Sequence, residues 1–148
     1  MKVMVINGPN LNMLGRREVA IYGGATLDDI ESLVRRRAGQ TGIDIEFFQS
    51  NKEGEIIDKI HSAVNNKVEG IVINPAGYTH TSVAIRDALL CVKIPFVEVH
   101  ISNIAKRESF RQKSLFSDIA IGTISGFGPI GYVLGLEALR ELYGKATE

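Results

Sequence analysis

Polar residues that could carry proton chemistry are crowded into the stretch that follows the first apolar run of the chain. The run Val3–Ile6 is rich in β-branched residues and stops at Asn7-Gly8-Pro9, which is typical of a buried strand ended by a turn. The loop after it contains Asn10, Asn12, Arg16, Arg17, Glu18 and Tyr22. Nearby guanidinium groups favour the ionised form of a phenol, which suggests a chemical role for this loop. A surface loop with a solvated arginine pair is the alternative.

Two of the three histidines follow apolar runs that are expected to be strands. His100 ends the run Phe96–Val99, and Glu98 stands two residues earlier, on the same face of a strand. A carboxylate there could orient the imidazole and hold it charged, ready to donate a proton. His80 comes after Asn74, which ends another apolar run; both could instead serve as turn or capping residues.

The apolar periodicity predicts the elements that must position these residues. Strands are expected at 3–6, 43–48, 70–74, 96–99 and 119–121, and helices begin near 26, 53, 81 and 128. Strict alternation predicts one domain over 1–148, with a five-stranded parallel sheet in a doubly wound, three-layer α/β fold. Ligands bind beyond the carboxyl ends of the strands in such folds, which is where both histidines fall.

Apolar residues within the loops and helices give further expectations. Leu11, Met13, Leu14 and Ile21 are predicted to anchor the N-terminal loop. Cys91 lies in an apolar run and is predicted to be a small core residue. Gly135 inside the last helix suggests close packing at that point.

The composition limits the classes of partner. The chain has 148 residues, with 17 basic and 17 acidic side chains, so no overall field favours nucleic acid or an acidic membrane surface. One cysteine excludes an internal disulfide and fits a reducing cytoplasm. No signal-peptide pattern and no apolar stretch of 18 residues is present, so a membrane role is not expected.

The sequence lacks the patterns that several other chemistries require. No short His, Cys and acid spacing supports a metal site, and no Gly-x-Ser-x-Gly elbow supports a nucleophilic serine. The segment Gly126–Gly131 matches the dinucleotide fingerprint, but the acidic strand end that should follow about 20 residues later is missing. These glycines therefore indicate a tight turn, with a flavin or nucleotide binder as the alternative. A non-catalytic oligomeric scaffold is a third possibility.

Three long motifs resemble the type II 3-dehydroquinate dehydratase (type II dehydroquinase) family, in the same order along the chain. The first is 7–18 (NGPNLNMLGRRE) followed by 21–23 (IYG), and the others are 74–82 (NPAGYTHTS) and 98–103 (EVHISN). The resemblance covers nearly the whole chain. It implies a flavodoxin-like fold and a cytoplasmic homododecamer built from trimers that needs no cofactor. The implied reaction is the dehydration of 3-dehydroquinate to 3-dehydroshikimate, in aromatic amino acid biosynthesis by the shikimate pathway or in quinate breakdown.

The resemblance also implies roles for individual residues. Tyr22 would be the base that removes a C2 proton, Arg17 would favour its phenolate, and His100, beside Glu98, would protonate the departing C1 hydroxyl. Asn10 would hold a water that stabilises the enolate. The implied substrate-binding groups are Asn74 and the amides of Ile101 and Ser102 for the carboxylate, and His80, Arg111 and a neighbouring subunit's Asp87 for the hydroxyls.

One position departs from the family pattern. The family commonly has proline after the Arg-Glu pair, where this chain has Val19. Proline would fix φ at that point, so the difference concerns the freedom of the loop, which is expected to close as a lid over the site, and leaves the chemistry as it is.

Overall fold

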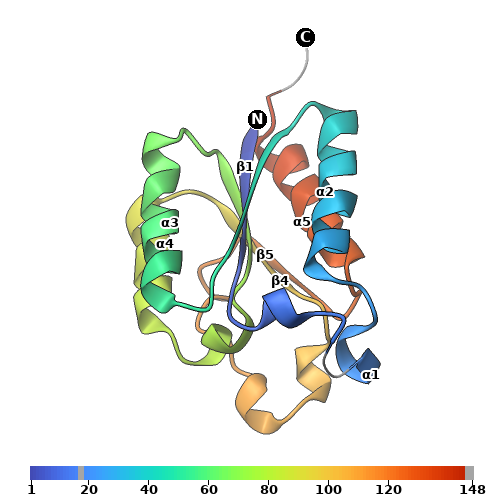
Figure 1. Cartoon of the computed structure of the whole chain (residues 1–148). Helices are drawn as coiled ribbons and strands as arrows, with labels where there is room; N and C mark the ends of the chain where they lie inside the picture. Colours follow the sequence, from blue (N-terminus) through green and yellow to red (C-terminus); the bar gives the residue numbers. More distant parts are fainter. Residues whose placement is uncertain (17–18, 146–148) are drawn as a thin grey trace.

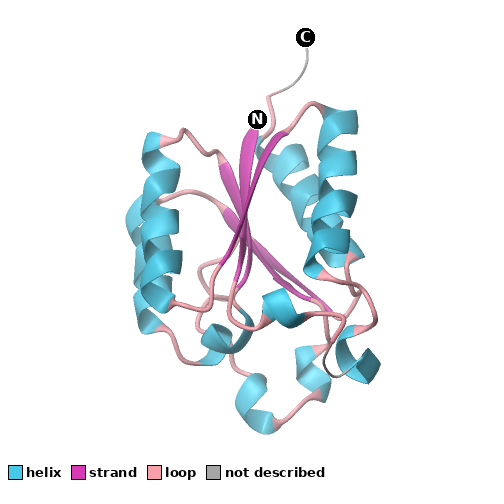
Figure 2. Ribbon diagram, viewed as in Figure 1, coloured by secondary structure: helices cyan, strands magenta, loops and turns pink. Residues whose placement is uncertain are grey.

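A five-stranded parallel sheet forms the centre of the computed structural model, which describes residues 1–16 and 19–145 (Figures 1 and 2). The spatial order is β2-β1-β3-β4-β5. The strands are β1 (Lys2–Asn7), β2 (Asp44–Gln49), β3 (Gly70–Asn74), β4 (Phe96–His100) and β5 (Gly122–Ser125). The order reverses between β1 and β3, which makes the fold doubly wound and confirms the predicted fold class.

Helices cover both faces of the sheet, as Figure 1 shows. The pair α2 (Leu27–Thr41) and α5 (Ile130–Tyr143) packs on one face, and the pair α3 (Glu53–Asn65) and α4 (Val83–Val92) on the other. The short α1 (Val19–Tyr22) lies near the carboxyl ends of the strands. Single 3₁₀ turns occur at Leu11–Met13, Ala76–His80, Ile104–Lys106 and Ser109–Arg111.

Side-chain alternation along the strands builds two separate apolar cores. Val3 and Val5 of β1 and Val72 of β3 pack toward α2 and α5, whereas Met4 and Ile73 pack toward α3 and α4. Continuing the same alternation to the strand ends, Asn7 and Asn74 fall on the α2/α5 face. Glu98 and His100 fall on the α3/α4 face, because Val97 and Val99 occupy the opposite one. The carboxyl edge therefore carries buried polar groups on both faces.

Helix α2 begins where the sequence predicted. Thr26 is the N-cap, its hydroxyl accepts from the Asp29 N–H at 3.1 Å, and the Asp29 carboxylate accepts from the Thr26 N–H at 2.9 Å. This capping box satisfies donors that the first turn of a helix leaves unpaired. The helix does not end at Gly39, as the pattern suggested. It continues to Thr41, and Gly42 caps it in the left-handed conformation, with a φ of 69°.

The glycines near α5 serve the turn and the packing that the sequence predicted. Gly126 and Gly128 have positive φ values of 95° and 70°, which permits the tight turn after β5. A methyl group added at Gly135 would lie 3.3 Å from a Val99 methyl, so the missing side chain allows α5 to pack closely on β4.

Three further local predictions are wrong. The last strand is Gly122–Ser125, because Ile119 and Ala120 instead form a turn, donating to the Phe116 carbonyl at 3.1 and 3.0 Å. Their apolar side chains pack on the core beside α3 and α4 from this turn, which accounts for the strand-like apolar signal.

Cys91 is exposed, since one turn of α4 directs Ala88 and Leu89 into the core and turns Cys91 away. In the N-terminal loop Leu11 and Leu14 are buried anchors, as predicted. Met13 and Ile21 are not anchors, because both are more than 40% exposed.

Candidate active site

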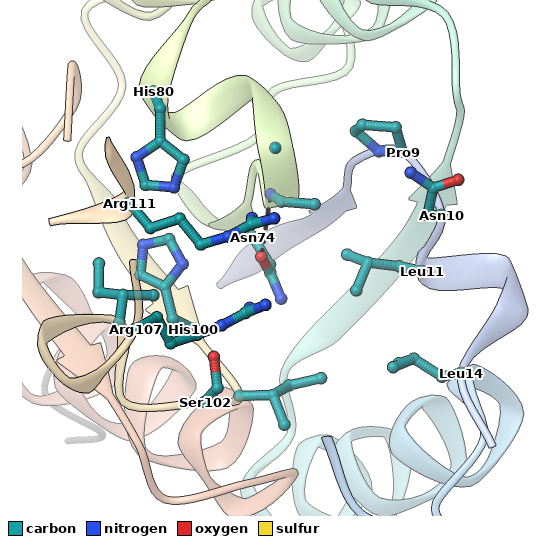
Figure 3. Close-up of a pocket in the computed structure, with 14 residues that line it drawn as sticks. Pro9, Asn10, Leu11, Leu14, Asn74, His80, His100, Ser102, Arg107 and Arg111 are labelled. Carbon is teal, nitrogen blue, oxygen red and sulfur yellow. Dashed lines mark hydrogen bonds between the residues drawn. The ribbon is translucent and has the colours of Figure 1, made fainter. Parts of the chain in front are cut away.

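A pocket of about 700 Å³, including its opening to solvent, lies at the carboxyl edge of the sheet (Figure 3). Residues from the ends of β3 and β4 and from the turns after them face the segment 9–14 across it. Seven residues singled out from the sequence line this pocket: Asn10, Asn74, His80, His100, Ile101, Ser102 and Arg111. The size and the mixture of apolar and polar lining are those of a small-molecule site.

His100 is held by a buried carboxylate at the back of the pocket. Its Nε2 lies 2.5 Å from Oε2 of Glu98, and the side chains are 6% and 1% exposed. A carboxylate only accepts, so Nε2 carries a proton and Nδ1 is the nitrogen left for a ligand. The contact expected between the two residues is present, and it fixes the orientation of the ring.

The carboxylate of Glu98 is kept ionised by its neighbours. Burial acts to raise its pKa, but hydrogen bonds from His100, Ser114 and Ser117 outweigh burial and lower the pKa below its usual value. The hydroxyls of Ser114 and Ser117 donate to Oε1 at 2.8 and 3.1 Å. A fixed negative charge therefore faces the Nε2–H of the His100 ring. We call Glu98, His100, Ser114 and Ser117 the acid cluster.

A second buried group lies on the other face of the sheet. The Tyr132 hydroxyl of α5 donates to Oδ1 of Asn7 at 2.6 Å and accepts from Nδ2 of Asn74 at 2.9 Å. Burial raises the pKa of Tyr132 well above that of a free phenol, so it stays protonated. Because none of these groups is charged, we call Asn7, Asn74 and Tyr132 the neutral cluster.

His80 is held differently from His100. Its Nδ1 lies 2.7 Å from the carbonyl oxygen of Lys113. A carbonyl only accepts, so Nδ1 carries the proton, and in a neutral ring Nε2 is the acceptor. His80 is therefore suited to accept a hydrogen bond from a ligand hydroxyl.

Two arginines give the pocket positive charge. Arg111 pairs with Glu108, Nε to Oε2 at 2.8 Å, and stacks on the Phe110 ring with its guanidinium carbon 5.2 Å from the centroid. The Arg107 side chain is only 12% exposed, and its Nε lies 3.8 Å from Oε2 of Glu108. An anionic ligand would therefore meet two guanidinium groups.

Backbone geometry shapes the remaining walls. Asn10 adopts a left-handed conformation with a φ of 68°, and its N–H donates to Oδ1 of Asn51 at 2.9 Å. The carbonyls of Ile101 and Ser102 accept from the Gly128 N–H at 3.0 Å and from the Ser125 hydroxyl at 3.1 Å. These bonds fix the chain direction after β4, where the sequence predicted an anion site.

Two predicted site residues whose side chains the structure describes do not line this pocket. Glu98 lies behind His100, and Asp87 is exposed on α4. Arg17 is outside the described residues. Tyr22 ends α1, but its side chain is outside the described part of the structure. The proposed base and its activating arginine therefore remain sequence-based expectations.

Four residues here were not identified as site residues from the sequence. Arg107 lies in the loop after β4, where an exposed arginine is common. Ser114 and Ser117 lie in a polar segment without a recognisable signal, and Tyr132 fits the apolar periodicity of the last helix. Tyrosine at a fully buried helix position is a weak signal, because its hydroxyl then needs partners.

Metal ligation and membrane insertion find no support in the part of the chain that the structure describes. Within residues 1–16 and 19–145, no three His, Cys, Asp or Glu side chains gather closely enough to hold a metal ion. Within the same ranges, no helix combines the length and apolarity that crossing a bilayer requires.

Comparisons with known proteins agree on one family. The sequence model for dehydroquinase class II matches residues 1–140. A 3-dehydroquinate dehydratase of Campylobacter jejuni is 54% identical, covering 96% of this chain and 89% of the relative. A 3-dehydroquinate dehydratase of Caldicellulosiruptor bescii is 55% identical, covering 95% of this chain and 97% of the relative. The crystal structure of type II dehydroquinase from Butyrivibrio crossotus superposes with a TM-score of 0.93 at 48% identity, covering 95% and 97% of the two chains.

Proposed function

The chain belongs to the class II dehydroquinase family, and on this premise we propose that it dehydrates 3-dehydroquinate to 3-dehydroshikimate through an enolate, with Tyr22 as base and His100 as acid. The observation that carries the proposal is the buried Glu98–His100 pair, which opens onto a polar pocket at the carboxyl edge of the sheet.

Proton removal is the first step of the proposed reaction. The Tyr22 phenolate takes a proton from C2, and the electrons of that bond form the C2–C3 double bond of an enolate. A free phenol has a pKa near 10, so only about one in a thousand is ionised at pH 7. Arg17, five residues earlier, is proposed to favour the phenolate. Support comes from α1, since its residues Ala20 and Ile21 share a surface hollow with Ser102 and Arg107.

Loss of water is the second step. The enolate reforms the C3 carbonyl, a double bond forms between C1 and C2, and the C1–O bond breaks. The imidazolium of His100 donates its Nδ1 proton to the leaving oxygen, so water departs and His100 becomes neutral. Glu98 supports this role because its carboxylate accepts from Nε2 and leaves Nδ1 of the ring for the ligand. A positioned acid typically contributes about 10²- to 10⁴-fold in rate.

The remaining pocket residues are proposed to bind and orient the substrate. Asn74 and the amides of Ile101 and Ser102 hold the carboxylate, and Asn10 holds a water against the enolate oxygen. His80 and Arg111 bind ring hydroxyls, His80 through its acceptor Nε2. The proposed steps use no metal and no cofactor.

Assembly is proposed to complete the site. Asp87 would reach the hydroxyls of a substrate bound in a neighbouring copy, in a homododecamer built from trimers. Its exposed place on α4, beside the exposed Val83 and Leu90, supports an interface on this helix. Light scattering checks the assembly, and a particle with the mass of a single chain would contradict it. A cytoplasmic location and a role in the shikimate pathway are proposed with it, and the family relationship supports both.

A direct assay tests the proposed reaction. Purified protein mixed with 3-dehydroquinate should produce the conjugated acid, which absorbs in the ultraviolet. Tyr22→Phe should abolish turnover while binding of a substrate analogue stays largely intact. Near-normal turnover in that variant would exclude Tyr22 as the base, and no turnover in the unmodified protein would overturn the proposal.

The flavin or nucleotide alternative rested on Gly126–Gly131. These glycines have another use, because they form the turn before α5 and let it approach Val99 and Ile124. Stoichiometric flavin in the purified protein would nevertheless reverse the preference for the dehydratase, and an absorbance spectrum is sufficient to detect it. A non-catalytic scaffold would leave 3-dehydroquinate unchanged in the assay above.

A further inference from the structure

The neutral cluster connects the pocket to a residue that does not line it. Asn7, Asn74 and Tyr132 are 0%, 3% and 0% exposed. Asn74 lines the pocket, whereas Tyr132 lies behind it on α5. A buried hydroxyl is unfavourable unless it is hydrogen-bonded, and this one makes two hydrogen bonds, to the side chains that end β1 and β3.

The direction of each hydrogen bond follows from a single backbone group. The N–H of Ala76 can only donate, and it lies 3.1 Å from Asn74, so the amide atom there is the oxygen Oδ1. The other amide atom of Asn74 is then Nδ2, which donates to the Tyr132 oxygen. The phenolic proton has to go elsewhere, and the Asn7 oxygen accepts it. The orientation of all three side chains is thereby fixed.

This arrangement leaves one Asn74 proton for a ligand. Nδ2 carries two protons, and Tyr132 accepts one of them. The second Nδ2 proton has no acceptor among the described residues, and Asn74 borders the pocket. Without the phenol oxygen, only the Ala76 N–H would hold the amide, so the direction of Nδ2 would be less restrained.

Asn7 indicates that the network serves orientation. Its Nδ2 is buried and has no hydrogen-bond partner among the described residues, which is unfavourable. Turning the amide over would give this nitrogen to the tyrosine oxygen, but the phenolic proton would then have no acceptor. The observed arrangement therefore keeps both hydrogen bonds of Tyr132 and leaves Nδ2 of Asn7 without an acceptor among the described residues.

From this geometry we infer that Tyr132 is a positioning residue that holds the Asn74 amide with an N–H directed at the carboxylate of the bound ligand. The inference rests on the proposed function only for the identity of that ligand. Tyr132 touches no reacting atom and acts through Asn74. Its hydroxyl therefore affects binding of the carboxylate more than the chemical steps.

Substitution by phenylalanine tests this role with little change in shape. In Tyr132→Phe we expect KM for 3-dehydroquinate to rise about three- to tenfold, the range for one lost hydrogen bond, while kcat changes less than twofold. Binding is measured in parallel with quinate and with the ring polyol that carries a hydroxymethyl group in place of the carboxylate. The variant should weaken quinate three- to tenfold and leave the polyol nearly unchanged. The ratio of two affinities on one sample does not depend on how much protein is folded.

A double-mutant cycle shows whether the effect passes through Asn74. In an Asn74→Ala background, Tyr132→Phe should no longer alter the ratio of the two affinities. Leu139→Val is the matched control, because Leu139 packs from the same helix on Gly70, at the opposite end of β3 from Asn74. It should lower stability and leave the ratio unchanged.

The outcomes separate the inference from the proposed function. An unchanged ratio in Tyr132→Phe, an equal loss for both ligands, or no preference for the carboxylate in the unmodified protein overturns the positioning role. If the unmodified protein does not dehydrate 3-dehydroquinate but the ratio shifts as expected, the proposed function fails and the positioning role stands.

Discussion

The acid cluster and the neutral cluster both stabilise buried polar groups, the first around a charge and the second without one. Both bury polar side chains at the carboxyl edge of the sheet, one on the α3/α4 face and the other on the α2/α5 face. The acid cluster contains an ionised carboxylate and can exchange a proton. The neutral cluster contains two amides and a phenol whose pKa is raised by burial, so it stays uncharged.

This difference in charge suggests that the acid cluster takes part in proton transfer and that the neutral cluster orients a binding group. A charge can be buried only when it is paired and hydrogen-bonded, and Glu98 has three such partners. The neutral groups need only matched donors and acceptors, so they hold a side chain in place without responding to pH. We therefore expect substitutions in the acid cluster to act on turnover and those in the neutral cluster on binding.

The largest effect is expected at the proton donor. His100→Asn keeps a polar side chain but removes the acid, so kcat for dehydration should fall about 10²- to 10⁴-fold. Steady-state kinetics by ultraviolet absorbance measures this fall. The control is His61→Asn, because His61 is exposed on α3 and far from the pocket in sequence and fold; its turnover should be normal. A decrease of less than tenfold in His100→Asn would place the acid elsewhere.

Removal of the charge behind the imidazole should have the next largest effect. Glu98→Gln is close in shape but removes the negative charge that faces the Nε2–H of His100. A hydrogen bond to a charged group is worth about 1.5–3 kcal/mol, which corresponds to roughly ten- to hundredfold in kcat. If kcat stays unchanged in this variant, Glu98 is a structural residue only. The acid cluster would then not differ from the neutral cluster in its effect on turnover.

Acid stability should also separate the two clusters. The pKa of Glu98 is lowered in the folded protein, so its contribution to stability is complete above the ordinary carboxyl pKa of 4.5 and is lost as the pH falls through the lowered value. Glu98→Gln should therefore flatten the decrease in unfolding free energy on the acid side. Tyr132→Phe should lower that free energy by about 1 kcal/mol at every pH from 4 to 7. Denaturant unfolding at several pH values compares the slopes, and equal slopes in all three proteins would contradict this expectation.

The smallest effects are expected at the serines that support Glu98. Ser114 donates to the carboxylate and its oxygen also accepts from the N–H groups of Phe116 and Ser117, at 3.0 and 3.2 Å. Ser117 makes only the longer bond to Glu98. Ser114→Ala should therefore cost about 1–3 kcal/mol and Ser117→Ala about 0.5–1 kcal/mol in unfolding free energy. A larger loss in Ser117→Ala would reverse this order.

Two concavities at opposite edges of the sheet show why the carboxyl edge carries the site. A larger hollow of about 1330 Å³ lies at the amino ends of the strands, between Met1, Glu69 and Arg140. Among the described residues, none of the buried polar side chains lines it. Size alone would have favoured the wrong hollow, whereas oriented buried polar groups indicate the other.

The sequence alone determined the layer order and the edge at which chemistry could occur. Apolar runs separated by helical periodicity leave few arrangements other than a parallel sheet covered on both faces, because both faces of every strand must be buried. The spacing of Glu98 and His100 was also sufficient to predict that the two side chains lie together. Residues two apart on a strand share a face, whatever surrounds them.

Only the tertiary structure decided which distant residues support that edge. Ser114, Ser117 and Tyr132 meet strand ends that lie 16, 19 and 58 or more residues away, and no local pattern predicts such contacts. The same holds for the exposure of Cys91 and the start of the last strand, where the turn at Phe116 competes with strand pairing for the same apolar residues. Local periodicity fixes which face a side chain occupies, but the partner it finds there depends on how the chain returns to that face.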